Sequence, residues 1–290
     1  MEDSVQVPIR RTTVGSRCIL LIASVLVFLV GIQLFVMTEM TDTFFAWTIQ
    51  SPLTAAFLGA AYWASFTMEF VASRQENWAF ARIAVPAVLV FTAVTLVVTV
   101  VHAELFHFGA PSLMTSFLAW SWLFVYAVVP PVMIVLLVRQ VRAGGVDPQR
   151  GPRLPGWFRA LLWCHAGLLL PIGVALLIAP EFAGQIWPWP LTPLTGRAIG
   201  AWLVGLGIAA VHALRENDWK RIQPATMSYV VFAGLELAAL ARYPGEVAWD
   251  APAAWIYLLF LLSASVVGVH GWWQASRSTA TSNAARTVGV

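Results

Sequence analysis

The sequence predicts an all-α fold: a polytopic membrane helix bundle of eight transmembrane helices, built as two parallel four-helix repeats with both chain ends in the cytoplasm. Of its 290 residues, 59% are hydrophobic and only 11% are charged, whereas a soluble domain carries about 25% charged residues. The hydrophobic residues fall in blocks of roughly 20, the length at which a helix rising 1.5 Å per residue crosses about 30 Å of hydrocarbon. The placement of the basic residues predicts the orientation, and an internal repeat predicts the duplication.

The elements follow in order along the chain. Residues 1–17 form a basic cytoplasmic segment, and the apolar run after them is too long for a signal-peptide core, so we expect it to be the first helix. The first four-helix repeat covers 18–138, a linker rich in Gly, Pro and Arg covers 139–157, and the second repeat covers 158–275. The small polar residues of 276–290 predict a disordered cytoplasmic tail. The eight spans are expected at 18–37, 53–72, 83–101, 116–138, 158–179, 198–214, 225–241 and 255–274.

The positions of the basic residues predict the orientation, because positively charged loops resist translocation. The chain has 17 Lys and Arg residues, and all but Arg197 and Arg242 lie in the N-terminal segment, in the second, fourth and sixth loops, or after the last span. Both chain ends and these loops are therefore expected in the cytoplasm, which requires an even number of spans. We expect a multi-pass protein of a cell membrane, the inner or plasma membrane of a bacterium.

An internal repeat is the most specific pattern in the chain. Sliding the sequence along itself places Trp47 on Trp189 and, after a slip of a single position, Arg74 on Arg215 within similar polar loops. Matches in polar loops rarely arise by chance, so the pattern indicates a duplication. Because each copy has an even number of spans, the two copies share one orientation about an axis along the membrane normal, which disfavours inverted-repeat transporter folds.

Small residues recur every four positions in the second and sixth spans. Such stripes let helix backbones approach closely, so we expect these two helices near the axis, although Ala is common throughout the chain and gives a simpler explanation. The residues of the stripes are Ala56, Ala60 and Ala64 in the second span and Ala201, Gly205, Ala209 and Ala213 in the sixth.

Three ionisable residues are candidates for an intramembrane proton or ion site: Glu236, Arg242 and Glu69. A charged group at the centre of a membrane helix costs roughly 3 kcal/mol by insertion scales, so each one is a functional hypothesis. Glu236 is the deepest, and it could exchange a proton or bind a cation. The alternative is a buried carboxylate that pairs with Arg242 or with a hydroxyl for packing alone.

Two groups of residues could bind a metal or relay protons. His165, His212 and His270 come from the fifth, sixth and eighth spans and are expected, with Glu69, in the cytoplasmic third of the bilayer, where they could also hold a haem. The alternative is that they lie separately at the wet interface. His102, Glu104 and His107 form an outer-side candidate at the end of the third span, and a wet helix end is the alternative.

No cofactor is expected from the sequence. Cys18 and Cys164 have no CxxC spacing, and the signatures of serine hydrolases, zinc proteases, P-loops and dinucleotide-binding folds are missing, which weighs against an enzyme without excluding one. The expected partners are membrane lipids, with other membrane subunits or a second copy as alternatives. Nucleic acid is not an expected partner, because no basic arm could follow a phosphate backbone.

Three function classes remain open. The first is a carrier or channel for a small solute, an ion or a lipid, with a pathway between the two halves and Glu236 as the coupling acid. The second is a non-catalytic scaffold or accessory subunit of a larger membrane complex. The third is a membrane haem or redox protein that uses the three histidines. A carrier should place Glu236 against a polar cavity, whereas a scaffold should have a solid core.

Overall fold

The computed structural model describes residues 8–288, with side chains as far as residue 278. Helices make up 78% of the chain, and the described residues contain no strand. The main helices are α1 (Val14–Gly31), α3 (Pro52–Ser73), α5 (Ala84–Val101), α6 (Leu113–Arg142), α7 (Gly156–Ile178), α9 (Pro193–Glu216), α10 (Trp219–Arg242) and α11 (Pro252–Val288). The short ones are η1 (Ile32–Val36), α2 (Thr41–Phe44), α4 (Trp78–Ala81), η2 (Ala103–Leu105), α8 (Pro180–Ala183), η3 (Gly184–Ile186) and η4 (Pro244–Glu246).

Each of the eight predicted spans coincides with one of the main helices. Among the described residues, seven helices are long and apolar enough to cross a membrane, which supports an integral, multi-pass membrane protein. The remaining main helix is α3, which has 22 residues but a more polar sequence that includes Ser65 and Glu69. Most of α3 is buried by other helices, so its polar side chains face protein.

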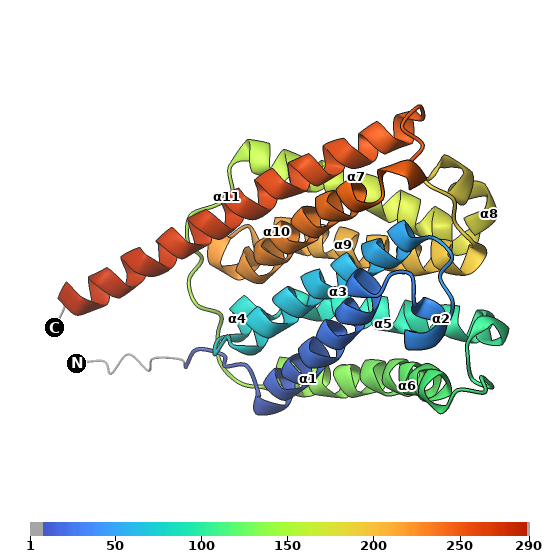
Figure 1. The fold of residues 1–290 in the computed structure, drawn as a ribbon. Helices are drawn as coiled ribbons and strands as arrows, with labels where there is room; N and C mark the ends of the chain where they lie inside the picture. The colour runs from blue at the N-terminus through green and yellow to red at the C-terminus, as the bar shows by residue number, and fades with distance from the viewer. Residues whose placement is uncertain (1–7, 289–290) are drawn as a thin grey trace.

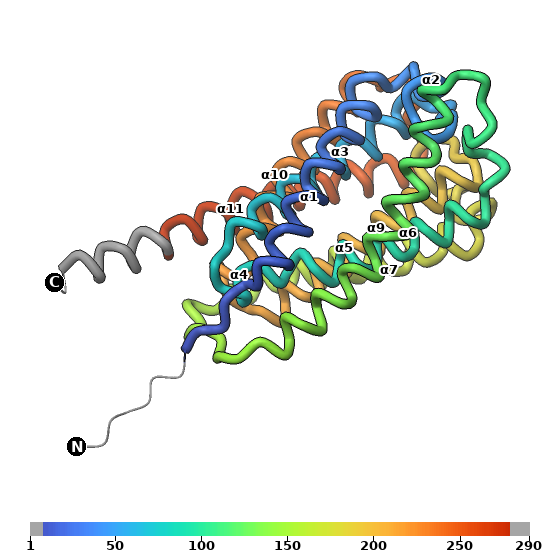
Figure 2. The backbone as a smooth tube through the Cα atoms, turned by 90° about the horizontal axis from the view of Figure 1, so that it is seen from below, coloured from blue at the N-terminus to red at the C-terminus, as the bar shows by residue number. Residues whose placement is uncertain are grey.

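The helices form two layers of four (Figure 2). In one layer α1, α3, α10 and α11 lie side by side, and in the other α6, α5, α9 and α7 do so. Each layer therefore combines two helices from the first half of the chain with two from the second. The beginning of α1 and the end of α11 lie at the same end of the bundle, together with the segment that joins α6 to α7 (Figure 1).

Helices α3 and α9 are the most buried and lie in the interior of the bundle, where the small residues of their stripes permit close packing. Two glycines allow the backbones of neighbouring helices to come into contact. A Cβ atom on Gly59 of α3 would lie 2.5 Å from the backbone nitrogen of Phe35 in η1, and one on Gly200 of α9 would lie 2.8 Å from the carbonyl oxygen of Gly173 in α7. Both helix pairs thus pack backbone against backbone.

The N-terminal segment is attached to the rest of the bundle by backbone hydrogen bonds. The Arg10 nitrogen donates to the carbonyl oxygen of Val146 at 2.9 Å, and the Thr12 nitrogen donates to that of Glu76 at 2.7 Å. Gly145 has a φ of +107°, a backbone conformation that L side chains rarely adopt, where the linker turns against this segment. The N-terminal segment therefore packs against the linker and against the loop after α3, all of which are expected on the cytoplasmic side.

Several helices begin or end some residues away from the predicted boundaries, and two differences concern the linker and the C-terminal tail. Helix α6 continues to Arg142, beyond the predicted start of the linker at residue 139. Helix α11 continues to Val288, over the segment 276–290 for which the sequence predicts a disordered tail, and residues 289–290 lie outside the described part. Extending an existing helix adds one hydrogen bond per residue without a new nucleus, which explains why a polar sequence continues the helix.

Candidate functional site

A large apolar cavity lies between α7 and α11, lined mostly by residues of the second half and also by Phe57 of α3. We call it the lateral pocket; its volume is about 470 Å³, and its walls include Phe57, Leu169, Leu203, Phe232, Ile256 and Phe260. Ile186 and Ile256 line it and are 64% and 52% exposed, so the cavity has apolar residues on the outer surface of the bundle. No charged side chain lines the pocket. Its size and composition are typical of sites that bind a small apolar molecule.

The deepest acid of the sequence analysis, Glu236, lies directly behind a wall of the lateral pocket, which is apolar and not the polar cavity expected beside this residue in a carrier. Tyr257 lines the pocket, and its hydroxyl donates a hydrogen bond of 2.9 Å to Oε2 of Glu236. Glu236 is fully buried, and its Oε1 atom has no hydrogen-bond partner among the described residues. Trp187 also lines the pocket, and its Nε1 is a buried donor without a partner in the described part of the chain.

Arg242 does not pair with Glu236. Its guanidinium donates to the carbonyl oxygen of Phe35 at 2.9 Å and lies over the ring of Tyr243, 4.9 Å from the ring centroid. Of the two packing partners considered for Glu236, the hydroxyl is the one present, and Tyr257 provides it.

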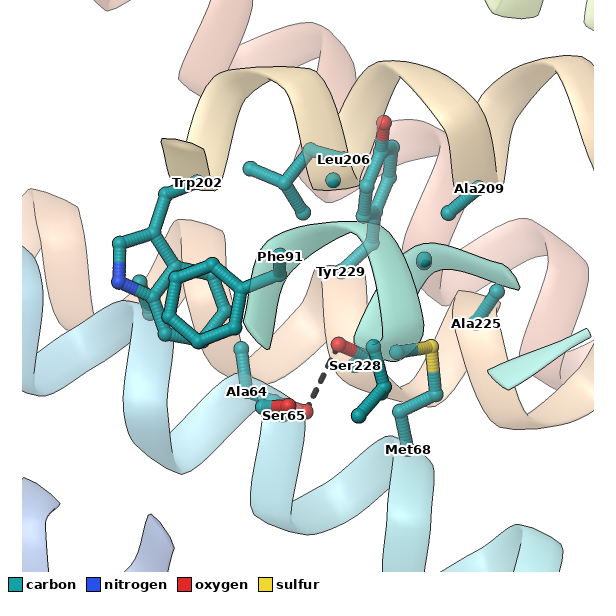
Figure 3. A pocket seen from close by; sticks show the side chains of 14 residues that line it. Ala64, Ser65, Met68, Phe91, Trp202, Leu206, Ala209, Ala225, Ser228 and Tyr229 are labelled. Carbon is teal, nitrogen blue, oxygen red and sulfur yellow. Dashed lines mark hydrogen bonds between the residues drawn. The ribbon is translucent and has the colours of Figure 1, made fainter. Parts of the chain in front are cut away.

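Glu69 lies on a different side of the core, near a small central cavity. The cavity has a volume of about 30 Å³, room for one or two water molecules, and Ser65, Ser228 and Tyr229 line it (Figure 3). Ser65 donates to Oε1 of Glu69 at 2.8 Å, and Ser228 donates to the carbonyl oxygen of Ala64 at 2.8 Å. The Oε2 atom of Glu69 has no partner within residues 8–288. Glu69 and Glu236 therefore occupy separate sites.

The contact between the two halves is closely packed by aromatic rings. Phe91 of α5 stacks on Trp202 of α9 with 3.8 Å between ring centroids (Figure 3). Tyr62 of α3 packs edge-on to Trp202 with 4.9 Å between centroids. At the end of the bundle away from the termini, a polar hollow of about 500 Å³ lies between residues 50–54 and 190–195. It includes Glu246, whose carboxylate accepts a hydrogen bond from Ser51 at 2.5 Å.

The three candidate histidines have different neighbours. His165 bonds Ser263 at 2.8 Å, and His212 bonds Glu216 at 3.2 Å. His270 lies among aromatic rings, with the centroid of Trp157 at 5.0 Å. No group of three His, Cys, Asp or Glu side chains in the described residues is arranged to hold a metal ion.

The outer-side candidates also separate. His102 Nε2 bonds the guanidinium of Arg197 at 2.7 Å, whereas His107 bonds Thr48 at 3.0 Å through the same ring atom. Glu104 is exposed in η2. Burial, followed by the positive charge of Arg197, lowers the pKa of His102 below its ordinary value. The neutral ring is therefore the favoured form in the folded protein.

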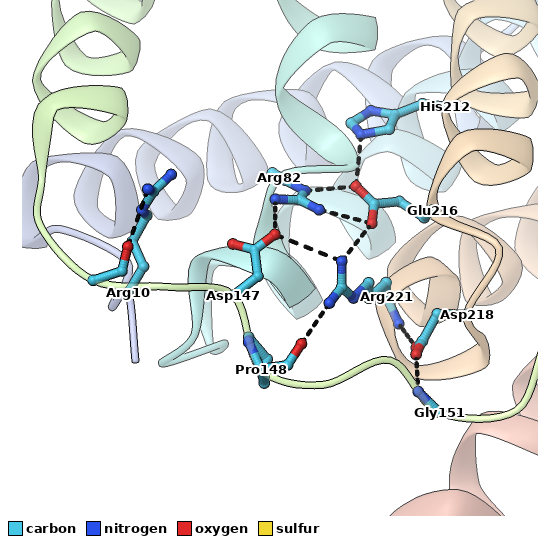
Figure 4. A network of polar contacts seen from close by, with 10 residues as sticks. Arg10, Arg82, Asp147, Pro148, Gly151, His212, Glu216, Asp218 and Arg221 are labelled. Atoms are coloured by element: carbon cyan, nitrogen blue, oxygen red, sulfur yellow. Dashed lines mark hydrogen bonds and ion pairs between the residues drawn. The ribbon is translucent and has the colours of Figure 1, made fainter. Parts of the chain in front are cut away.

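A partly buried ion network, which the sequence analysis did not identify, connects both halves with the linker (Figure 4). Arg82 forms a bidentate pair with Glu216 at 2.5 and 2.8 Å and also contacts Asp147 at 2.5 Å. Arg221 contacts Glu216 at 3.2 Å. Hydrogen bonding to Glu216 is the main reason that the pKa of Arg82 is raised. The loop charges were visible in the sequence, but nothing in it indicated which of them meet.

No protein-family model, curated protein or solved structure matches this chain. The functional argument therefore depends on the geometry of the lateral pocket and on the Glu236–Tyr257 pair behind it.

Proposed function

We propose that this protein is a membrane carrier that takes a neutral, lipid-soluble molecule from the bilayer into the lateral pocket. The observation that carries the proposal is an apolar cavity of about 470 Å³ with exposed apolar residues at its mouth and no charged side chain in its wall. A charged ligand would lose its hydration there without compensation, whereas an apolar body would be stabilised by the aromatic wall. Of the substrates considered from the sequence, a lipid fits better than an ion or a polar solute.

The proposal includes the finer architecture: eight transmembrane helices in two parallel four-helix repeats, with both chain ends in the cytoplasm of a cell whose plasma membrane holds the protein. In the proposed repeat, α1, α3, α5 and α6 correspond to α7, α9, α10 and α11. A rotation that exchanges the two halves would therefore place one helix layer on the other. The contact of α1 with α3 then corresponds to that of α7 with α9, α5 with α6 to α10 with α11, and α3 with α10 to α9 with α5. This pattern supports a two-fold axis between α3 and α9. With 22 residues, α3 is about 33 Å long, enough to span.

A pathway between the two halves has less support than the lateral pocket. The stacked rings of Phe91 and Trp202 occupy that position, and the central cavity beside them holds only one or two waters. The proposed route therefore opens sideways to lipid, within the second half.

A non-catalytic scaffold is the second candidate, and the closely packed centre favours it. Its partners would be other membrane subunits or a second copy of the chain. The two candidates differ over the lateral pocket, because a scaffold has no need of an occupied cavity there.

Filling the pocket tests the proposal. Ile256→Trp places a large ring at the mouth of the pocket, and Leu259→Trp, on the same helix but outside the pocket, is the matched control. We expect the wild type and Leu259→Trp to co-purify with a neutral lipid enriched over the bulk membrane extract, measured by mass spectrometry, and Ile256→Trp to lose most of it. Equal amounts in all three proteins, or no enriched lipid in the wild type, would favour the scaffold.

A further inference from the structure

We propose that the lateral pocket takes up a neutral lipid of the outer leaflet, with its apolar tail directed toward the middle of the bilayer and its polar head at the loop after α7. This inference rests on the proposed function, because it specifies the leaflet that supplies the ligand and the orientation in which the ligand binds. It also gives a role to the hydrogen bond between His165 and Ser263, which closes the pocket toward the cytoplasmic side.

The first step of the argument is the position of the pocket walls along their helices. Phe260 lies eight residues after the start of α11, Leu203 ten residues after the start of α9, and Leu168 ten residues before the end of α7. At 1.5 Å per residue, the walls reach about 12 to 15 Å from the same end of the bundle. The hydrocarbon of a bilayer is about 30 Å thick, so the pocket extends over roughly one leaflet.

The second step concerns the shallow end of the pocket. Gln185 and Ile186, in the loop after α7, line this end and are exposed. The loop lies at the end of the bundle away from the beginning of α1 and the end of α11 (Figure 1). The placement of the basic residues predicts that this end faces outward. The pocket therefore opens toward the outer leaflet.

The third step concerns the deep end, where α7 meets α11. The ring of His165 packs edge-on to that of Phe260, with 5.1 Å between centroids. Ser263 donates its hydroxyl proton to the carbonyl oxygen of Phe260 at 2.8 Å, so Nε2 of His165 is the donor in the 2.8 Å bond to the Ser263 hydroxyl. A tail that came from the cytoplasmic leaflet between α7 and α11 would have to break this bond.

The fourth step decides which end of the lipid enters first. Leu169, Leu203 and Phe260 form the deep part of the wall, and no charged side chain among the described residues lines the pocket. A polar head at this depth would lose its hydration without compensation, whereas an apolar tail is stabilised by leaving water. The head therefore stays at the exposed end, beside Gln185 and Ile186.

The test uses two monoacylglycerol probes with the same chain, which carry a photoreactive diazirine either next to the head group or at the end of the tail. The full-length protein in lipid nanodiscs is irradiated with each probe, and the labelled residues are identified by peptide mass spectrometry. We expect the head-proximal diazirine to label residues 185–188 and 251–253, and the terminal diazirine to label Leu168, Leu169, Leu203 and Phe260. The reverse order, or the same pattern for both probes, would overturn the proposal.

Two serine variants test the closure of the deep end. Ser263→Ala removes the hydroxyl that His165 bonds, so the terminal diazirine should also label residues 161–164 and 264–268, on the cytoplasmic side of this bond. Ser265→Ala is the matched control and should label as the wild type, because the Ser265 hydroxyl bonds only its own helix, at the carbonyl oxygen of Leu261. Unchanged labelling in Ser263→Ala would show that the bond does not close the pocket. The wild-type pattern tests the orientation of the lipid without either variant.

A cysteine identifies the leaflet. In a background with Cys18→Ser and Cys164→Ser, we expect a membrane-impermeant maleimide to label Gln185→Cys on intact cells. Labelling only after the cells are opened would place the mouth of the pocket in the inner leaflet and overturn the proposal.

The outcomes separate this inference from the proposed function. If the probes label the pocket in the wrong order, or from the inner leaflet, the inference is wrong while lipid binding stands. If neither probe labels the pocket of the wild type, or if Ile256→Trp leaves the labelling unchanged, the lipid-binding function fails, and this inference fails with it.

Discussion

The two flanks of the bundle differ in how their space is filled. On the flank of the first half, Trp122 and Tyr126 of α6 point into the core, where Trp122 packs edge-on to Phe45 with 5.3 Å between centroids. In the repeat alignment that places Arg74 on Arg215, their counterparts are Ser263 and Val267 in α11, which have smaller side chains. The lateral pocket lies on the flank of the second half. Two similar helix arrangements thus support a packed core on one flank and a cavity on the other.

The buried polar residues of the two flanks also differ. In the same alignment, Glu236 and Tyr257 correspond to Thr95 and Ser116 of the first half. Ser116 donates to a backbone carbonyl at 2.8 Å, and Thr95 Oγ1 has no partner in the described part of the chain. The Glu236–Tyr257 pair therefore has no equivalent at the corresponding positions of the first half.

Comparing the two flanks as equivalent regions requires that the two halves have the same orientation in the membrane. Cysteine labelling tests this, and its expected result is all or none. In a background with Cys18→Ser and Cys164→Ser, single cysteines replace four exposed residues that form two pairs: Thr43 with Gln185, and Arg74 with Arg215. A membrane-impermeant maleimide on intact cells should label the first pair and leave the second unlabelled until the cells are opened. If the members of a pair fall on opposite sides, the halves are not parallel.

A large difference is expected between Glu216 and Gln75, its counterpart in the first half. Glu216→Ala leaves Arg82 and the buried Arg221 without their shared carboxylate, so the free energy of unfolding should fall by about 3–5 kcal/mol. Gln75→Ala removes only a weak 3.4 Å bond to a backbone carbonyl and should cost under about 0.5 kcal/mol. Unfolding titrations in SDS measure both, and equal losses would show that the network is unimportant.

A smaller difference is expected between Gly173 and Gly31. A Cβ atom on Gly173 would meet backbone atoms of α9 at 2.9 Å, which cannot move aside, so Gly173→Ala should cost about 2–3 kcal/mol in the same titration. A Cβ on Gly31 would meet only the ring of Trp63, which can rotate toward lipid, so Gly31→Ala should cost about 1 kcal/mol. Gly234→Ala, with open space around it, is the control, and a loss there as large as at Gly173 would contradict the steric explanation.

Much of the fold could be predicted from local features of the sequence. Each predicted span coincides with a helix. Ser51 and Thr192, which cap α3 and α9, each precede a Pro-Leu-Thr sequence, at 52–54 and 193–195. The deep position of Glu236 was also predictable, since it depends only on its distance from the ends of its span. The lateral pocket was not, because its walls come from α3, α7, α9, α10 and α11 at once.

The sequence by itself determined that this is an apolar, multi-helix chain typical of a membrane protein and roughly where its long helices lie, because hydropathy and helix signals depend on neighbouring residues. Only the tertiary structure decided which polar atoms meet. Arg82 and Glu216 are 134 positions apart, and Tyr257 reaches Glu236 from the next helix. Hydrogen bonds depend on tenths of an ångström between side chains, and only the packing of helices against one another fixes such distances.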